Sequence, residues 1–196
     1  MVFLSADQIN ELVESGALSI DPFDSNLLKG ASYTLRLGNT FCLWKNEEEP
    51  IELWTKNSAS NYLTPVFQAD NYVLKPGTFL LGSTLEKIGF PENHIGILYT
   101  ISHLARFGIT VCHSSAWINP GFGKHEPTAL TLEIHSVNPS PIRIKTGIPV
   151  CHLIIAKVSE NENILPIVRK SVYEGIKSPS LPRLYEEYKN LLFQND

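Results

Sequence analysis

The stretch Ala129-Leu130-Thr131-Leu132-Glu133-Ile134 decides the fold class, because apolar and polar residues alternate along it from Leu130 onward. Such alternation is typical of a β-strand that buries one face. Other strand-like runs are Tyr33-Thr34-Leu35-Arg36-Leu37, Phe79-Leu80-Leu81, Ile95-Gly96-Ile97-Leu98-Tyr99 and Val150-Cys151-His152-Leu153-Ile154-Ile155. Turn-forming sequences separate them: Lys75-Pro76-Gly77, Phe90-Pro91-Glu92-Asn93, Asn119-Pro120-Gly121 and Asn138-Pro139-Ser140-Pro141. The sequence therefore predicts an all-β fold, a distorted barrel or sandwich.

Short helices are expected near both ends of the chain. Ser5 and Gln8 have the spacing of a capping box, and Gly16 suits a helix end, which predicts a helix over about residues 5–15. Leu184 and Tyr188 lie at helical spacing within a tail of about residues 170–196, and we expect this helix to dock on the core. The length of 196 residues and the lack of an internal repeat predict a single domain over residues 1–196.

Composition excludes several classes of protein. Hydrophobic residues make up 43% and charged residues 18% of the chain, as in a folded globular protein. The net charge of -4 argues against a nucleic-acid partner, which would require a basic surface. No apolar run is long enough to span a membrane, and the first residues do not resemble a secretory signal. The widely spaced Cys42, Cys112 and Cys151 indicate reduced thiols, so a cytoplasmic location is expected.

Several segments, in the same order along residues 4–158, resemble the dCTP deaminase branch of the dUTPase-like superfamily. They are Leu18-Ser19-Ile20-Asp21-Pro22, Gly30 to Asn39, Lys75-Pro76-Gly77, Ser102 to Gly108 and Ile118 to Phe122. In that family R-S-S-L-A-R precedes a strand, and I-D-P-G-W leads to V-L-E. The matching residues are Ser102, Leu104, Ala105 and Arg106, then Ile118, Pro120 and Gly121, then Leu132 and Glu133. The resemblance implies a dUTPase-like fold and the hydrolytic deamination of a cytosine deoxynucleotide, with release of ammonia.

The resemblance also implies roles for individual residues. Glu133 would be the general base and acid, while Ser102 and Arg106 would position water and substrate. The implied substrate-binding residues are Ser102, His103, Leu104, Ala105, Arg106, Asn119, Thr131, Leu132 and Glu133. The family assembles as homotrimers with active sites between subunits, and Mg²⁺ accompanies the nucleotide phosphates rather than the catalytic carboxylate. A zinc-dependent route would need H-x-E and P-C-x-x-C signatures, which this sequence lacks, so no metal is expected at the catalytic carboxylate.

The residues that differ from the family pattern are mainly those that would contact the phosphates of the nucleotide. Ile101 and Trp117 stand where the family has arginines, His103 replaces a Ser, and Thr34 and Asn119 replace aspartates. A hydrogen bond to a charged group contributes about 1.5–3 kcal/mol, so losing two arginines would weaken triphosphate binding by roughly two to four decades. We therefore expect a site that retains its base-reading half and has an altered phosphate half, which leaves the substrate open between dCTP and a related nucleotide.

Some residues could compensate for the missing arginines. His103 keeps a donor, and Lys124 and His125 lie in a short insertion that is also compatible with an ordinary hairpin loop. Asn119 could bond a sugar hydroxyl, and Trp117 could stack on a base, although we expect it in the core. Tyr173 to Arg183 resembles the family's C-terminal lid only faintly.

Two other functions are compatible with the same resemblance. A dUTP diphosphatase would need an acidic residue in the I-D-x-x-Y-type motif, and Asn119 cannot act as that base. A non-catalytic trimer, either nucleotide-binding or purely structural, would explain the missing arginines. A non-catalytic trimer would not explain why Ser102, Arg106 and Glu133 match the family's catalytic residues.

Overall fold

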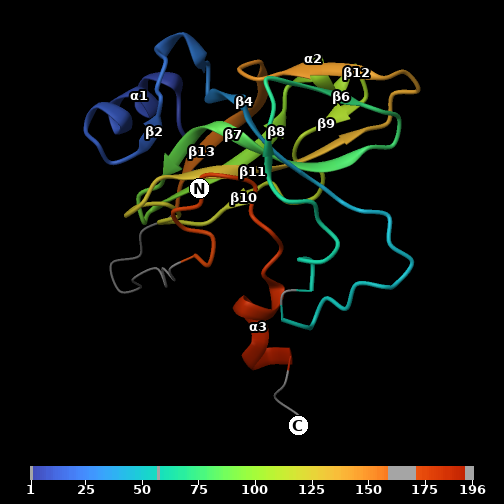
Figure 1. Ribbon diagram of the computed structural model, residues 1–196. Coiled ribbons are helices and arrows are strands. Elements are labelled where there is room, and N and C mark those ends of the chain that lie inside the picture. Colours follow the sequence, from blue (N-terminus) through green and yellow to red (C-terminus); the bar gives the residue numbers. More distant parts are fainter. Residues whose placement is uncertain (1, 57, 159–170, 193–196) are drawn as a thin grey trace.

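Most of the regular secondary structure is β-strand, which confirms the all-β prediction (Figure 1). The computed structural model describes residues 2–56, 58–158 and 171–192. The longer strands are β4 (Ser32–Leu43), β7 (Phe79–Gly89), β8 (His94–Thr100), β11 (Thr128–Ser136) and β13 (Pro149–Lys157). The shorter strands are β1 (Val2–Phe3), β2 (Ser19–Asp21), β3 (Leu28–Lys29), β5 (Phe67–Gln68), β6 (Asn71–Leu74), β9 (Ile109–Thr110), β10 (Trp117–Ile118) and β12 (Ile142–Lys145). The helices are α1 (Ala6–Glu14), the 3-10 turn η1 (Ser25–Leu27), α2 (Ser102–Ala105) and α3 (Leu184–Leu192).

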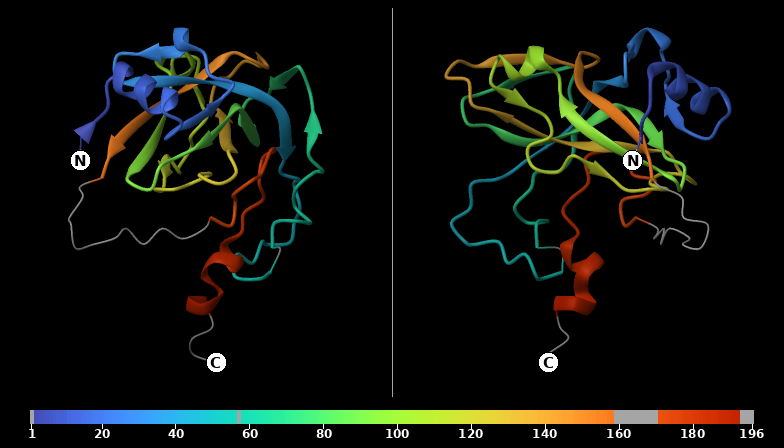
Figure 2. Two further views of the ribbon diagram at one scale, coloured as in Figure 1. Left: turned by 90° about the vertical axis from the view of Figure 1, so that its left-hand side faces the viewer. Right: turned by 180° about the vertical axis from the view of Figure 1, so that it is seen from behind.

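The main sheet runs in the order β10-β8-β13-β4-β7-β11-β9, and neighbouring strands are antiparallel. This sheet curls around the core as a distorted barrel, with the C-terminal tail extending from one end (Figure 2). Strands β6 and β12 form a separate antiparallel pair. The largest fully buried side chains include Tyr33 and Phe41 of β4 and Phe90, which directly follows β7. The predicted distorted barrel therefore surrounds one main hydrophobic core.

Strand β11 follows the predicted alternation. Leu130, Leu132 and Ile134 are buried in the core, while Thr131 and Glu133 on the opposite face are partly exposed. Since successive side chains of a strand point to opposite faces, this register brings both polar side chains to one surface. The pairing with β7 shifts between Ala129 and Thr131, just before these residues.

The N-terminal helix α1 begins and ends close to the predicted bounds. The main-chain N–H of Gln8 donates to Ser5 Oγ at 3.3 Å, and the main-chain N–H of Ser5 donates to Gln8 Oε1 at 3.0 Å. These two bonds form the expected capping box. Ile9 buries its side chain completely, which anchors the helix on the core.

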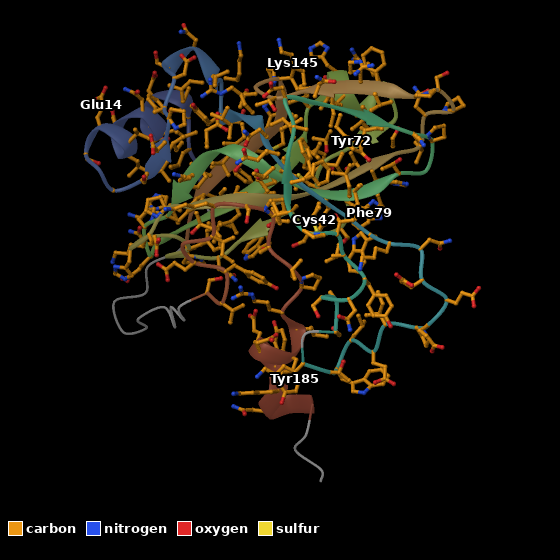
Figure 3. The ribbon with its side chains drawn as sticks, viewed as in Figure 1. Glu14, Cys42, Tyr72, Phe79, Lys145 and Tyr185 are labelled. Carbon is orange, nitrogen blue, oxygen red and sulfur yellow. The ribbon has the colours of Figure 1, made fainter. Side chains whose placement is uncertain are left out.

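The C-terminal helix α3 forms where it was predicted, but it does not dock on the barrel core. The helix projects beyond the barrel. Figure 3 shows Tyr185 on this helix, well separated from Cys42 and Phe79, which belong to the barrel. Leu184 and Tyr188 remain 43% and 44% exposed. The docking prediction is wrong for one chain, since among residues 184–190 only Tyr185 and Glu186 are partly buried. Among the described residues, no helix is both long and apolar enough to cross a membrane.

Candidate active site

A cavity of about 400 Å³ lies where β11, the β10 loop and the C-terminal tail meet. Apolar side chains such as Leu98, Ile118 and Phe122 form part of its wall. Glu133, Thr131 and Asn119, three of the residues predicted to bind substrate, also line it. The size is at the lower end of the range of about 300–1,000 Å³ that is usual for small-molecule sites.

The carboxylate of Glu133 is held in one orientation by the loop that follows β9. Its Oε2 accepts the main-chain N–H of Ser114 at 2.8 Å, the Ser114 hydroxyl at 3.3 Å and the main-chain N–H of Ser115 at 3.3 Å. The loop itself is fixed to the strand, because the main-chain N–H of Glu133 donates to Val111 O at 2.9 Å. No donor from the described residues is bonded to Oε1. This oxygen can therefore accept a proton from water.

Trp117 and Asn119 are bonded to each other at the wall of the cavity. The indole Nε1–H donates to Asn119 Oδ1 at 3.0 Å. Trp117 is 54% exposed, so the expectation that it packs in the core is wrong. The physical reason is that its strand β10 is only two residues long and directs Ile118, rather than Trp117, inward. Trp117 therefore offers its ring to the cavity.

The C-terminal tail covers one side of the cavity. Its main-chain groups bond to β11: the N–H of Gly175 donates to Thr128 Oγ1 at 2.7 Å, and the N–H of Ala129 donates to Ile176 O at 3.0 Å. Thr131 Oγ1 lies 2.9 Å from Ser180 Oγ and accepts the main-chain N–H of Ser180 at 3.0 Å. Thr131 is thus engaged by the tail of its own chain.

Tyr173 is a tail residue that the sequence did not single out by itself. Its ring lines the cavity, and its hydroxyl accepts the main-chain N–H of Arg183 at 2.9 Å. Burial raises the pKa of this phenol above its ordinary value. Ser114, Ser115 and Ser180 were also missed, because a Ser in a loop carries no signal until the loop is placed. The faint resemblance of Tyr173 to Arg183 to a lid was the available signal for the tail.

The α2 segment lies outside the cavity of its own chain. Ser102, His103, Ala105 and Arg106 are exposed and are not among the lining residues, and Leu104 packs partly against the core. Leu132 is fully buried among core residues, so its side chain does not reach the cavity. Within one chain, the structure brings together Asn119, Thr131 and Glu133 but not Ser102 or Arg106.

Comparison with known proteins identifies the class of enzyme to which this barrel and its carboxylate-lined cavity belong. The family described as dCTP deaminase-like matches residues 3–158. The chain therefore belongs to the dCTP deaminase-like family and is an enzyme of the dCTP deaminase type.

Individual relatives agree with this assignment. A protein of Methanospirillum hungatei JF-1 named "dCTP deaminase, dUMP-forming" is 30% identical over 182 residues, or 93% of this chain and 96% of that protein. A protein of the same name from Mycobacterium tuberculosis H37Ra is 31% identical over 193 residues, or 95% and 98% of the two chains. The crystal structure of 2'-deoxycytidine 5'-triphosphate deaminase from Agrobacterium tumefaciens has the same fold, with a TM-score of 0.59 and 19% identity. That match covers 78% of this chain and 46% of the solved one.

Proposed function

We propose that the protein deaminates a cytosine deoxynucleotide by hydrolysis, with Glu133 as the proton shuttle. The observation that carries the proposal is the Glu133 carboxylate, fixed through Oε2 by the main chain of Ser114 and Ser115 and lining the cavity. Relatives that are 30–31% identical over most of their length are named dCTP deaminases.

The chemistry needs one water molecule and one base. Glu133 Oε1 would take a proton from water as the water oxygen attacks C4 of the cytosine ring. The same carboxylate would deliver this proton to ring nitrogen N3. It would then take the proton of the new C4 hydroxyl and pass it to the departing amine, so that the C4–N bond breaks, C4=O forms, and cytosine and water become uracil and ammonia. No metal ion is required at Glu133 in this scheme. Mg²⁺ would accompany only the phosphates of a nucleotide.

Ser102 and Arg106 would reach the cavity from a neighbouring subunit. Both lie on the exposed α2 segment, outside the cavity of their own chain. Tyr99 and Phe107 flank this segment and are 68% and 60% exposed, so they offer apolar surface that a second subunit would cover. We therefore propose a homotrimer, as the family resemblance implies, in which α2 of one subunit completes the site of the next.

The direct test is ammonia release by the Glu133→Gln variant, which keeps the shape of the side chain and loses the base. We expect activity to fall by at least about a hundredfold, since general acid–base catalysis contributes about 10²–10⁴-fold. Glu92→Gln is the matched control, because Glu92 is paired with Lys124 at 2.9 Å outside the cavity. Unchanged turnover in a folded Glu133→Gln protein would refute the mechanism.

Mixing of subunits tests the shared site. The Glu133→Gln and Arg106→Ala variants should each be inactive, but unfolding and refolding them together should restore roughly a quarter of the activity, because mixed trimers contain some intact sites. A mixture that stays inactive would contradict a site shared between subunits. Release of pyrophosphate should be measured in the same assays, since the relatives' names state that dUMP is formed.

A further inference from the structure

The loop that holds the Glu133 carboxylate lies at the surface of the protein. Residues 113–115 are all exposed, and Ser114 and Ser115 supply the donors to Glu133 Oε2. Exposed loop segments are mobile unless contacts with the rest of the fold restrain them. The orientation of Glu133 therefore depends on what holds this segment against the sheet.

Both ends of the segment are fixed by main-chain contacts. Cys112 forms an isolated parallel bridge with Glu133 of β11. On the other side, Ala116 O accepts the main-chain N–H of Leu98 of β8 at 2.8 Å. These contacts set where the segment begins and ends, and the side chain of His113 supplies a further contact between them.

The His113 ring rests on two rings of the sheet. Phe79 of β7 and His135 of β11 are opposite each other in the strand register, and their ring centres are 6.5 Å apart. The centre of the His113 ring lies 5.2 Å from that of His135, at an interplanar angle of 89°, and 5.7 Å from that of Phe79. Edge-to-face contacts at such separations are favourable between aromatic rings. We call Phe79, His113 and His135 the ring cluster.

The ring cluster and the carboxylate bonds join the same segment to the same face of β11. Since His135 follows Glu133 by two residues, both side chains point to the same side of the strand. His113 directly precedes Ser114, so a displacement of its ring would also displace the N–H that lies 2.8 Å from Glu133 Oε2. Neither imidazole is among the described residues that line the cavity, so neither touches a ligand bound there in its own chain.

We infer that His113 is a positioning residue for Glu133, and that the ring cluster keeps Ser114 and Ser115 bonded to Oε2. Oε1 then stays available to the water molecule of the proposed reaction. The inference rests on the proposed deamination and adds to it a residue that acts through Glu133 rather than on the substrate. Loss of the ring should lower kcat and leave KM nearly unchanged, because the placement of the base affects the chemical step and not substrate binding.

The test measures kcat and KM for ammonia release from dCTP by the full-length protein. In His113→Ala we expect kcat to fall by about tenfold or more and KM to change by less than about twofold, since misplacing a catalytic group by about 1 Å can cost about a hundredfold. His113→Phe keeps a ring against Phe79 and His135, so its kcat should stay within about threefold of that of the unmodified protein. A low kcat in both variants would overturn the inference, because ring contact would then not be what positions Glu133. Unchanged kcat in His113→Ala, or a change confined to KM, would overturn it as well.

Phe67→Ala is the matched control for a general loss of stability. Phe67 belongs to another group of three rings, together with Phe41 and Tyr72, whose centres are 6.0–6.1 Å apart. Phe67 is not among the described residues that line the cavity. The control variant should be destabilised in urea, as His113→Ala is, but should retain its kcat. An equal fall of kcat in both variants would mean that kcat follows stability, and this would overturn the inference.

Hydrogen exchange at the Ser114 amide tests the same inference without a substrate. We expect this amide to exchange about two- to tenfold faster in His113→Ala than in the unmodified protein, the effect of losing one aromatic contact, and to keep its rate in His113→Phe. An unchanged rate in His113→Ala would overturn the inference whether or not the protein releases ammonia. Absence of ammonia from the unmodified protein would instead refute the proposed function.

Discussion

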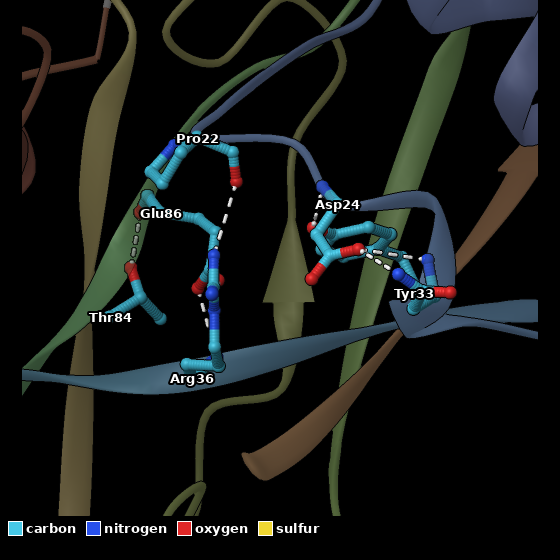
Figure 4. A network of polar contacts seen from close by, with 7 residues as sticks. Pro22, Asp24, Tyr33, Arg36, Thr84 and Glu86 are labelled. Atoms are coloured by element: carbon cyan, nitrogen blue, oxygen red, sulfur yellow. Dashed lines mark hydrogen bonds and ion pairs between the residues drawn. The ribbon is translucent and has the colours of Figure 1, made fainter. Parts of the chain in front are cut away.

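Glu86 is a completely buried carboxylate in β7, and one arginine matches its charge. Arg36 Nε–H donates to Glu86 Oε1 at 2.6 Å, and the main-chain N–H of Arg36 donates to Oε2 at 2.9 Å (Figure 4). The hydrogen bond that Arg36 donates to Glu86 is the main reason that the pKa of Arg36 is raised. This pair joins β4 to β7 inside the barrel, where a lone charge would be costly.

Removal of the arginine should destabilise the fold. We expect Arg36→Met to lower the free energy of unfolding by about 3 kcal/mol, the lower end of the usual range for breaking a buried pair, because Arg36 is partly exposed. Urea denaturation measures this change. The double variant Arg36→Met/Glu86→Leu should recover most of the stability, since it leaves no unpaired charge. A loss of less than about 1 kcal/mol in the single variant would show that Glu86 does not depend on Arg36.

Tyr33 makes the stability of the protein sensitive to alkali. Its side chain is fully buried, and its hydroxyl accepts the main-chain N–H of Asp24 at 3.0 Å. Burial, more than any other effect, raises the pKa of Tyr33 above its ordinary value. The folded state therefore holds this proton more tightly than the unfolded state does.

The free energy of unfolding should consequently fall as the pH rises above about 10, the ordinary pKa of tyrosine. In this range the unfolded chain loses the Tyr33 proton first, so each further pH unit favours unfolding. Tyr33→Phe should flatten this part of the curve, at the cost of the bond to Asp24. Urea denaturation between pH 8 and about 11 measures both slopes. Equal slopes in the two proteins would mean that other groups cause the alkaline loss.

At the scale of elements, β11 shows which features of the site the sequence pattern predicts and which it does not. Its alternation predicted both the strand and the common face of Thr131 and Glu133. The pattern did not reveal that the same strand holds the C-terminal tail, because those bonds join residues more than forty positions apart. The distant tail supplies Ser180 and Tyr173 to the site, and periodicity within a strand carries no information about them.

The attachment of the tail to β11 can be tested by hydrogen exchange. Thr128→Val keeps the size of this buried side chain but removes the oxygen that accepts the N–H of Gly175. We expect the Gly175 amide to exchange about two- to tenfold faster, since a lost hydrogen bond is worth about 0.5–1.5 kcal/mol. Thr146→Val, whose hydroxyl bonds to Ala69 O in a turn away from the cavity, is the control. An unchanged rate at Gly175 would mean that other contacts hold the tail.

At the scale of the whole molecule, the exposed aromatic side chains beside α2 predict an assembly. Tyr99→Asp places a charge at a surface that we expect a second copy to cover. The protein should change from a trimer to a monomer in sedimentation experiments and lose activity at the same time, because α2 would no longer reach a neighbouring site. Leu53→Asp, at a residue that is 57% exposed in a distant loop, should leave the trimer intact. A monomeric unmodified protein with full activity would contradict the shared site.

Alternation of apolar and polar residues was enough to specify the curled all-β sheet, and a capping box was enough to place α1, because both patterns are local. The sequence also singled out Glu133 as the candidate base, because this residue matches the Glu of the family's V-L-E motif. Only the tertiary structure decided that Ser114 and Ser115 hold Glu133, that Trp117 faces the cavity, and that α2 lies outside the cavity of its own chain. These features depend on how distant loops fold over one strand and on which surfaces remain uncovered, and no short stretch of sequence contains that information.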